Sequence, residues 1–332
     1  MRLVPERAGP HDPLPTTPTR MPGSIRRTST LDFRRPQGIE GPVRLDARAR
    51  DLLTLADGSA EVLTTATLSG TIDWSTRTLV DVESDPVTPA LADLVGGSVA
   101  SGFRARLAVA VPEHVAARTL LHLLLDDLPG AELVSGYALQ RAGSYGDMPV
   151  TEESMAGMVD LCAGWAGDAT LLEIVRSEGL IATPMGPPAP RIERDDDPVG
   201  WHEIDALGPH SSRRRRRLDL MPTDDPGVWR FAAHFRDSHM DDAGNETVVH
   251  EYTVAGTVDT ATRRLVEAEA AARVLPWVEC PGAVPSAATM AGASLADLRH
   301  RVRKEMRGVH TCTHLNDTMR AIADLDVLLE HR

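Results

Sequence analysis

Hydrophobic and polar residues alternate with a period of two along several segments of the chain. The clearest segments are residues 41–54, 60–73, 76–84, 247–259 and 263–271, and they are rich in β-branched side chains. This alternation is typical of β-strands with one buried face. The turn sequences DWST and DTAT separate consecutive segments. We therefore predict antiparallel meanders in both halves of the chain.

After each meander the hydrophobic period changes to about 3.6, the spacing of an amphipathic helix. Residues 102–111 and 115–128 show this pattern in the first half, and residues 295–306 and 314–332 show it in the second. Strands followed by helices in each half predict an α+β fold in which the helices cover one face of a sheet.

The two halves also align with each other. LSGTIDWSTRTLVDVES (68–84) matches VAGTVDTATRRLVEAEA (254–270) at an offset of 186, and RRTSTLD (26–32) matches RRRRRLD (213–219) at 187. Gly96 and His114 align with Gly292 and His310 at 196, so the second half holds an insertion between about 270 and 292. This colinear series predicts a tandem duplication whose copies form a pseudo-dimer.

Four regions follow from these patterns. Residues 1–23 are expected to be a disordered leader, with translation starting at Met1 or Met21. Residues 24–140 form the first α+β repeat, which is degenerate and structural. Residues 141–212 form a spacer with a helical stretch (151–179) and a proline-rich part. Residues 213–332 form the second repeat.

Composition limits the classes of function. The net charge of −13 over 332 residues argues against nucleic-acid binding, which needs an excess of basic residues. No apolar run reaches the length of a membrane span, and the first residues lack the apolar core of a signal peptide. Three cysteines without a secretion signal predict reduced thiols and a cytoplasmic protein. The composition is compatible with binding of a small anionic ligand or of a protein partner.

The run Arg213–Arg217 aligns with the start of a strand in the first repeat. A strand sends alternate side chains to opposite faces. We expect a solvated or anion-facing strand, with Arg26, Arg27, Arg213 and Arg215 lining an anion-binding face.

Candidate chemistry is confined to the second repeat. Ala116 and Arg118 occupy the first-repeat positions of Cys312 and His314, and the first repeat lacks the insertion that carries Cys280. The second repeat has both cysteines and the first repeat has neither. We therefore predict that Cys280 and Cys312 lie close together in space.

Thiolate and imidazole groups are the preferred ligands of zinc and are common ligands of iron. The predicted metal ligands are Cys280, Cys312, His310 and His314, with Asp317 orienting a ligating imidazole. If a helix begins near Thr313, Thr313 can act as its N-cap together with Asn316 three positions later. The helix dipole would then stabilise a Cys312 thiolate.

Other interpretations of these residues stay open. Cys312 and His314 could instead act catalytically as a metal-free thiol nucleophile and its base, in an enzyme of small-molecule or acyl-thioester catabolism. The cluster could serve a non-enzymatic metal or sulfur carrier, or be purely structural. Cys162 is expected in the core. The histidines at 202, 210 and 250 are expected to be surface or satisfied polar positions, and His250 is the least ordinary because it lies within a predicted strand.

The segment LPWVECPGAVPSA, the sequence MAGASLADLRHRVRKEM and the motif Cys-Thr-His-Leu at 312–315 resemble a bacterial family, domain-of-unknown-function family 2889, over most of residues 24–330. The resemblance implies no activity. More distantly, an antiparallel sheet followed by Cys280, Ser-Ala, helices and Cys312 is similar to the NifU/IscU iron–sulfur scaffolds. That likeness implies a zinc or cluster site at Cys280 and Cys312, although the scaffold's first cysteine has no counterpart and the same region offers only His234 and His239.

Overall fold

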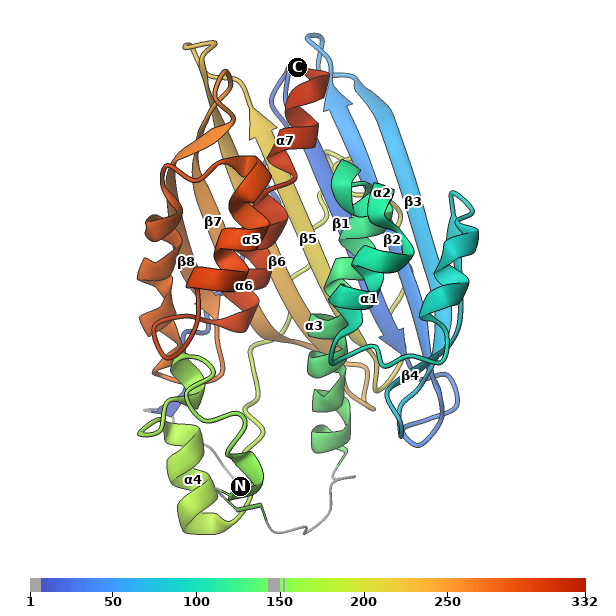
Figure 1. The fold of residues 1–332 in the computed structure, drawn as a ribbon, viewed down its shortest axis with the longest axis vertical. Coiled ribbons are helices and arrows are strands. Elements are labelled where there is room, and N and C mark those ends of the chain that lie inside the picture. Colours follow the sequence, from blue (N-terminus) through green and yellow to red (C-terminus); the bar gives the residue numbers. More distant parts are fainter. Residues whose placement is uncertain (1–6, 143–149, 152) are drawn as a thin grey trace.

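The protein is described by a computed structural model that covers residues 7–142, 150, 151 and 153–332. One antiparallel sheet of eight strands, in the order β4-β3-β2-β1-β5-β6-β7-β8, runs through the whole molecule (Figure 1). The strands of the first half are β1 (Ile25–Arg34), β2 (Val43–Thr54), β3 (Ala60–Asp73) and β4 (Thr78–Asp85). Those of the second half are β5 (Ser212–Met221), β6 (Val228–Met240), β7 (Glu246–Asp259) and β8 (Arg264–Val274).

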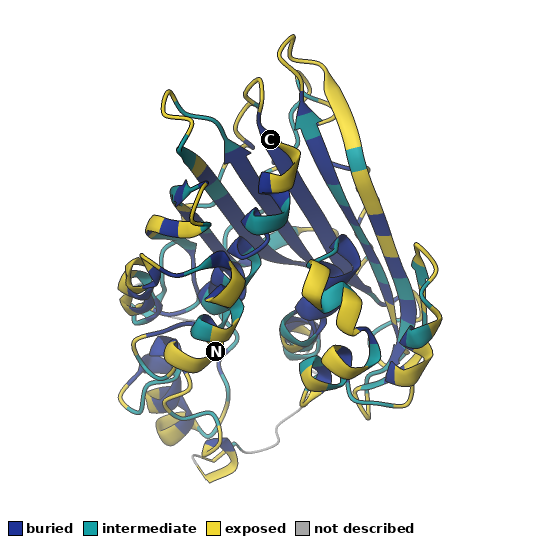
Figure 2. Cartoon of the chain, turned by 45° about the horizontal axis from the view of Figure 1, so that its top comes forward, coloured by how far each residue is buried: buried dark blue, intermediate teal, exposed yellow. Residues whose placement is uncertain are grey.

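The helices that follow each meander cover the same face of the sheet (Figure 1). In the first half these are α1 (Phe103–Ala110), α2 (Pro112–Ala117) and α3 (Leu120–Arg141). In the second half they are α5 (Leu295–Glu305), α6 (Thr313–Ile322) and α7 (Leu325–Leu328). Between the sheet and these helices lie two hydrophobic clusters, one in each half, and the central strands are almost continuously buried (Figure 2).

The α+β fold class is therefore confirmed. The two halves share one continuous sheet because β1 pairs with β5, and they do not form two separate domains. Both halves have the same order of strands and helices. The tandem duplication itself stays an interpretation of this order and of the sequence alignment.

Reciprocal ion pairs join the halves on the sheet face that the helices leave free. Arg26 of β1 donates two hydrogen bonds to the Asp219 carboxylate, at 2.6 and 3.1 Å. Arg213 of β5 donates two to Asp32, both at 2.6 Å. In each case the partners are directly opposite across the β1–β5 pair. A residue of each half thus neutralises its counterpart, as in an isologous dimer interface.

On the helix-covered face, Arg214 makes the central contact between the halves. It donates to Asp237 on β6 at 2.9 and 3.0 Å. Its Nη1 atom reaches Asp127 on α3 of the other half at 3.3 Å and Asp317 on α6 at 3.1 Å. Arg216 donates two more bonds to Asp127, at 2.5 and 2.6 Å. Carboxylates from three elements therefore surround the arginine run.

Arg27 occupies the corresponding position on β1. It donates to Asp51 on β2 at 2.8 and 2.7 Å and to Asp324, after α6 in the other half, at 2.9 Å. In each half, a buried arginine thus binds one carboxylate from the neighbouring strand of its own half and one from the helical layer of the other half. The pattern relates Arg27 to Arg214 and Asp51 to Asp237.

The prediction that the arginine strand is solvated or lines an anion-binding face is wrong. Arg213–Arg217 are all buried. Arg26, Arg27 and Arg213 are bonded to aspartates as described, and Arg215 donates to Glu193 at 2.7 Å. These four guanidinium groups are held by the protein's own carboxylates, because a charge taken out of water needs a partner.

Residues 7–23 are also not a disordered leader. Thr17 is 1% exposed, its amide donates to the Ile192 carbonyl, and Trp201 Nε1 donates to its hydroxyl at 2.8 Å. The Leu14 amide donates to Glu251 at 2.7 Å. The segment packs against the sheet together with part of the spacer, since both satisfy buried polar groups there. Residues 1–6 of the predicted leader lie outside the described residues.

The helical prediction for 151–179 holds only at its end, as α4 (Thr170–Glu178). Residues 151 and 153–169 form short 3-10 turns and loops, and residue 152 of the predicted helix lies outside the described residues. Gly157, Gly164 and Gly167 lie in this part, and glycine disfavours a continuous helix. The rest of the spacer crosses the open face of the sheet, where both ring nitrogens of His202 contact the hydroxyls of Thr28 and Thr30 at 2.9 Å.

We predict that Asp127→Asn lowers the free energy of unfolding by about 3 to 5 kcal/mol, because it removes the charge partner of the buried Arg216 guanidinium and one of the three carboxylates around Arg214. Urea denaturation measures the change. The matched control is Asp93→Asn, the same replacement at an exposed carboxylate, which should shift the free energy by less than about 0.5 kcal/mol. Equal effects of the two variants would contradict the role of Asp127.

Stability should also depend on His202. Burial, reinforced by Arg50 and Arg48, lowers the pKa of His202 from 6.5 to about 3. Above pH 6.5 the ring is neutral in both states. As the pH falls from 6.5 toward 3, the unfolded chain takes up a proton that the folded protein does not, so the free energy of unfolding decreases. The contribution at pH 5 is about 2 kcal/mol.

Urea midpoints of the wild type and His202→Gln at pH 7 and pH 5 test this prediction. The variant should lose less stability than the wild type over that interval. The same loss in both proteins would show that His202 does not contribute to the pH dependence.

Candidate metal centre

Two strands of the second half bring a carboxylate and an imidazole side by side. Asp237 on β6 lies directly opposite His250 on β7, and the register of the two strands shifts immediately after Asp237. A β-bulge of this kind bends a strand and redirects side chains. Both side chains lie on the helix-covered face, where Asp237 is 1% exposed.

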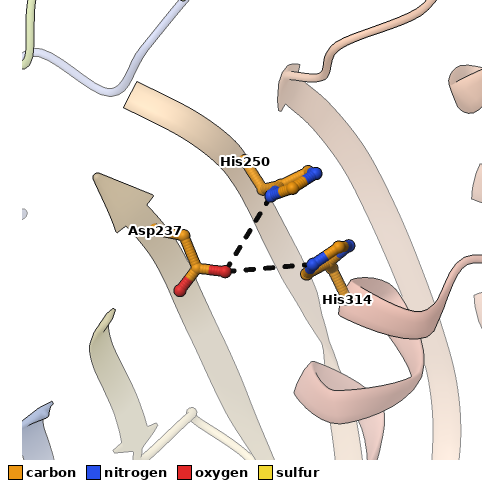
Figure 3. Close-up of side chains that lie close together, drawn as sticks. All are labelled: Asp237, His250 and His314. Carbon is orange, nitrogen blue, oxygen red and sulfur yellow. Dashed lines mark ion pairs between the residues drawn. The ribbon is translucent and has the colours of Figure 1, made fainter. Parts of the chain in front are cut away.

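The start of α6 supplies the third group. His314 lies in the first turn of this helix, and its ring stacks on that of His250 with 3.6 Å between the centroids and 19° between the planes. Asp237 Oδ2 is 3.9 Å from His250 Nδ1 and 4.0 Å from His314 Nε2 (Figure 3). One ligand atom from each of the three residues lies within 4.8 Å of the others.

The two ring nitrogens that face Asp237 lack hydrogen bonds. Neither His250 Nδ1 nor His314 Nε2 has a hydrogen-bond partner within the described part of the chain, although both atoms are buried. Most buried polar atoms in proteins are hydrogen-bonded, so two unpaired nitrogens aimed at one carboxylate need an explanation. Side-chain exposures of 14% for His250 and 12% for His314 leave limited access from outside.

Both imidazoles are electrically neutral in this environment. Burial lowers the pKa of His314 to about 3, and the nearby Arg214 guanidinium acts in the same direction. Burial also lowers the pKa of His250 well below 6.5, reinforced by His314. A neutral imidazole offers a nitrogen lone pair, which is the form that binds a metal.

Arg214 fixes the carboxylate of this group through the paired hydrogen bonds described above. The close approach of α3 to Arg214 depends on Gly130, because a Cβ atom there would lie 2.5 Å from Arg214 Nη1 and 2.4 Å from Asp317 Oδ2. The ion network between the halves therefore also positions Asp237.

Cys312 lies on the other side of the His314 ring. Its Sγ atom is 3.8 Å from His314 Nδ1. Cys312 is itself the N-cap of α6, so Thr313 is the first helical residue and not the cap, and Asn316 Nδ2 donates to the Met306 carbonyl instead. Burial raises the pKa of Cys312 although the Tyr252 hydroxyl and backbone amides of the helix act in the opposite direction. The effect of burial on the pKa of Cys312 thus outweighs that of these hydrogen bonds.

The other two thiols lie in the same region. The Ala163 amide donates to the Thr311 carbonyl at 2.9 Å, and a Cβ atom at Gly164 would lie only 2.7 Å from Cys280 Sγ. Besides burial, the charges of Cys312 and Cys162 raise the pKa of Cys280. All three cysteines are buried free thiols.

The remaining predicted residues are placed differently. His310 is exposed in the turn before α6. Asp317 accepts hydrogen bonds from Arg104, Arg214 and Arg320 at 2.8 to 3.3 Å, so its carboxylate faces arginines. His314 is the one predicted ligand that belongs to the Asp237 group.

Sequence reasoning missed Asp237 and left His250 as an unusual mid-strand histidine. A signal for Asp237 was available, since it lies 186 positions after Asp51, the offset of the internal alignment. In the first half, Asp51 lies opposite Thr64 just before a register shift of the same kind. Thr64 thus takes the place of His250 there.

Comparison with known proteins gives one match. Residues 212–327 match the model of a family described as Protein of unknown function (DUF2889). This segment includes Asp237, His250 and His314. No curated protein and no solved structure matches the chain, so the NifU/IscU likeness stays a prediction. Among the described residues, none of the helices is both long and apolar enough to span a bilayer.

We predict that Gly164→Ala destabilises the protein by about 1 to 3 kcal/mol, because its new methyl group would overlap the Cys280 sulfur. Cys280→Ala should remove most of this penalty in the double variant. Gly157→Ala is the control, since a Cβ atom there meets nothing within 4 Å. Additive effects of the two substitutions in a denaturation cycle would rule out the contact.

Proposed function

We propose that this protein binds one divalent transition-metal ion, zinc or iron(II), through Asp237, His250 and His314. The observation that carries the proposal is the pair of buried, unpaired ring nitrogens that face a single carboxylate oxygen. Two neutral imidazoles and a carboxylate are a common ligand set for catalytic zinc and for non-haem iron.

The spacing of the three groups is close to that of a metal centre. Ligands about 2.1 Å from a tetrahedral ion lie about 3.4 Å from one another. The distances from Asp237 Oδ2 are 3.9 and 4.0 Å. Binding would bring the side chains a few tenths of an ångström closer and would also turn the stacked rings of His250 and His314 so that both nitrogen lone pairs point at the ion.

In this arrangement Cys312 is not a metal ligand, because it lies beside the ring nitrogen of His314 that faces away from Asp237. Its sulfur faces Nδ1 of His314. A hydrogen on Nδ1 directed at the sulfur leaves the Nε2 lone pair free on the side of Asp237. Metal-bound imidazoles usually donate their second N–H to a fixed acceptor, which sets the tautomer and the ring orientation. Cys312 is the candidate for that acceptor.

Three protein ligands leave coordination positions open. Structural zinc sites are usually closed by four protein ligands, whereas catalytic sites keep a position for water or substrate. The bound ion would act there as a Lewis acid that polarises a carbonyl or activates water. The proposal thus favours an enzyme over a carrier protein. It includes a cytoplasmic location, which the three free thiols support.

Metal analysis tests the site. The wild-type protein, dialysed against zinc or iron(II), should retain about one equivalent. His250→Ala and His314→Ala should each weaken binding by more than the roughly 10-fold that loss of a residue hydrogen-bonded to a ligand costs. The control His310→Ala removes an exposed histidine near the same helix and should bind normally. Retention of one equivalent by both site variants would overturn the proposal.

Cys312→Ser separates two versions of the centre. If Cys312 only orients His314, the variant keeps about one equivalent with reduced affinity. If the ion is instead bound by the ligands that the sequence predicted, Cys280, Cys312, His310 and His314, the variant loses the metal.

A second candidate function is metal-free thiol chemistry. Cys312, His314 and Asp237 follow one another in the order of a nucleophile, a base and an orienting carboxylate. Burial, which raises the pKa of Cys312, disfavours it. Absence of metal binding together with turnover that depends on Cys312 would favour this alternative.

A further inference from the structure

A cavity of about 320 Å³ lies between the helical layers of the two halves. Its walls come from α1 on one side and from α5 and α6 on the other, which face each other across the front of the sheet (Figure 1). Small-molecule sites in proteins have volumes from about 300 Å³ upward and occur often between domains or helices. The cavity therefore has the size of a site for a small ligand.

Positive charge dominates its lining. Arg104 of α1, Arg303 of α5 and Arg320 of α6 line the cavity, together with one acidic residue, Asp317. Arg320 is engaged with Asp317 and Asp126. The excess of guanidinium groups favours a negatively charged ligand.

Two of these arginines have donors to spare. Arg104 bonds Asp126 and Asp317 only through Nε and Nη2, which leaves Nη1 without a hydrogen bond to the described residues. Arg303 forms no ion pair with any carboxylate in the described ranges, unlike its neighbours on α5, Arg299 and Arg301. An unpaired arginine at the edge of a cavity can bind a carboxylate through two parallel hydrogen bonds.

The other lining residues are mixed. Phe103, Val302 and Met306 border the cavity with side chains that are only 0 to 4% exposed, and Thr313 and Asn316 add polar groups. The volume of about 320 Å³ accommodates a small organic acid more fully than a bare inorganic anion.

The cavity and the candidate metal centre share α6. Thr313, Asn316, Asp317 and Arg320 of this helix line the cavity, whereas His314 points to the sheet. Asn316 Oδ1, on the same wall, is buried without a hydrogen bond to the described residues. A ligand in the cavity would therefore contact the helix that carries His314.

We infer that this cavity binds a small organic acid, with its carboxylate between Arg104 and Arg303. The inference goes beyond the proposed metal site and does not require it. It assigns the interface between the two halves to ligand recognition, with one arginine from each half.

Isothermal titration of metal-free protein with benzoate tests the inference, and benzamide serves as the uncharged analogue. Benzoate should bind more tightly than benzamide, acetate or inorganic phosphate. Arg303→Gln should weaken benzoate binding at least 10-fold. Arg301→Gln is the matched control, because Arg301 lies on the same helix, pairs with Glu305 and is outside the lining.

A second variant tests the other wall. Ala105 of α1 is exposed and lines the cavity, so Ala105→Glu introduces a repelling carboxylate without disturbing the core. Ala108→Glu, an exposed position of the same helix outside the lining, should bind benzoate normally.

Three results would overturn the inference: equal affinity for benzamide and benzoate, wild-type affinity in both cavity variants, or no binding of the acids up to about 10 mM. Loss of metal binding in His314→Ala with unchanged benzoate binding would count against neither proposal. Failure of one proposal is thereby distinguishable from failure of the other.

Discussion

The structure depends on the neutralisation of arginines at the junction of its two halves. β5 carries five consecutive arginines, and every one of them is buried. Isolated charges at such positions would carry a large desolvation penalty. Aspartates from β1, β6, α3 and α6 pair with Arg213, Arg214 and Arg216. Arg215 pairs with Glu193 and Arg217 with Asp219 of the same strand. In return, β1 supplies arginines that pair with aspartates of β5 and of the helical layer. The pairing specifies how the halves join, because a shift of register by one residue would exchange the two faces of the strand.

The same network supports the candidate metal centre. Arg214 holds Asp237 in place and contacts Asp127 of the first half and Asp317 of α6. The carboxylate of the site is thus fixed by charges from both halves, while its imidazoles come from β7 and α6. The first half retains the equivalent pair, Arg27 and Asp51, but Thr64 lies opposite Asp51 where the second half has His250. The two halves therefore share an ionic framework, and only the second adds the groups that can bind a metal.

With the proposed metal centre next to the proposed anion-binding cavity, the interface between the halves would bind both a metal ion and an organic acid. In the proposed arrangement, α6 presents His314 toward the sheet and Arg320 toward the cavity. Arg303, which forms no ion pair with the described carboxylates, lies at the edge of the cavity. The acidic overall charge of the protein does not oppose this arrangement, because local potentials follow the nearest groups and are screened over about 10 Å at ordinary ionic strength.

Most strands and most helices could be predicted from the sequence, because hydrophobic periodicity indicates which face of an element is buried. The α+β class, the order of elements and the location of candidate chemistry in the second half followed from periodicity and from the internal alignment. His314 was identified because its neighbours Cys312 and Asp317 form a dense local motif. The glycine-rich part of the spacer and residues 7–23 were misjudged, since their order comes from hydrogen bonds to distant strands.

Only the tertiary structure decided what the arginines and the histidines contact. Asp237 is ordinary in the sequence, and His250 lies 64 positions before His314. They come together because β6 pairs with β7 and α6 packs across both strands. A run of arginines is predicted to be exposed when its carboxylate partners lie far away along the chain and cannot be recognised from the sequence. Periodicity determined the elements of this protein, and long-range pairing of charges determined which side chains could share a site.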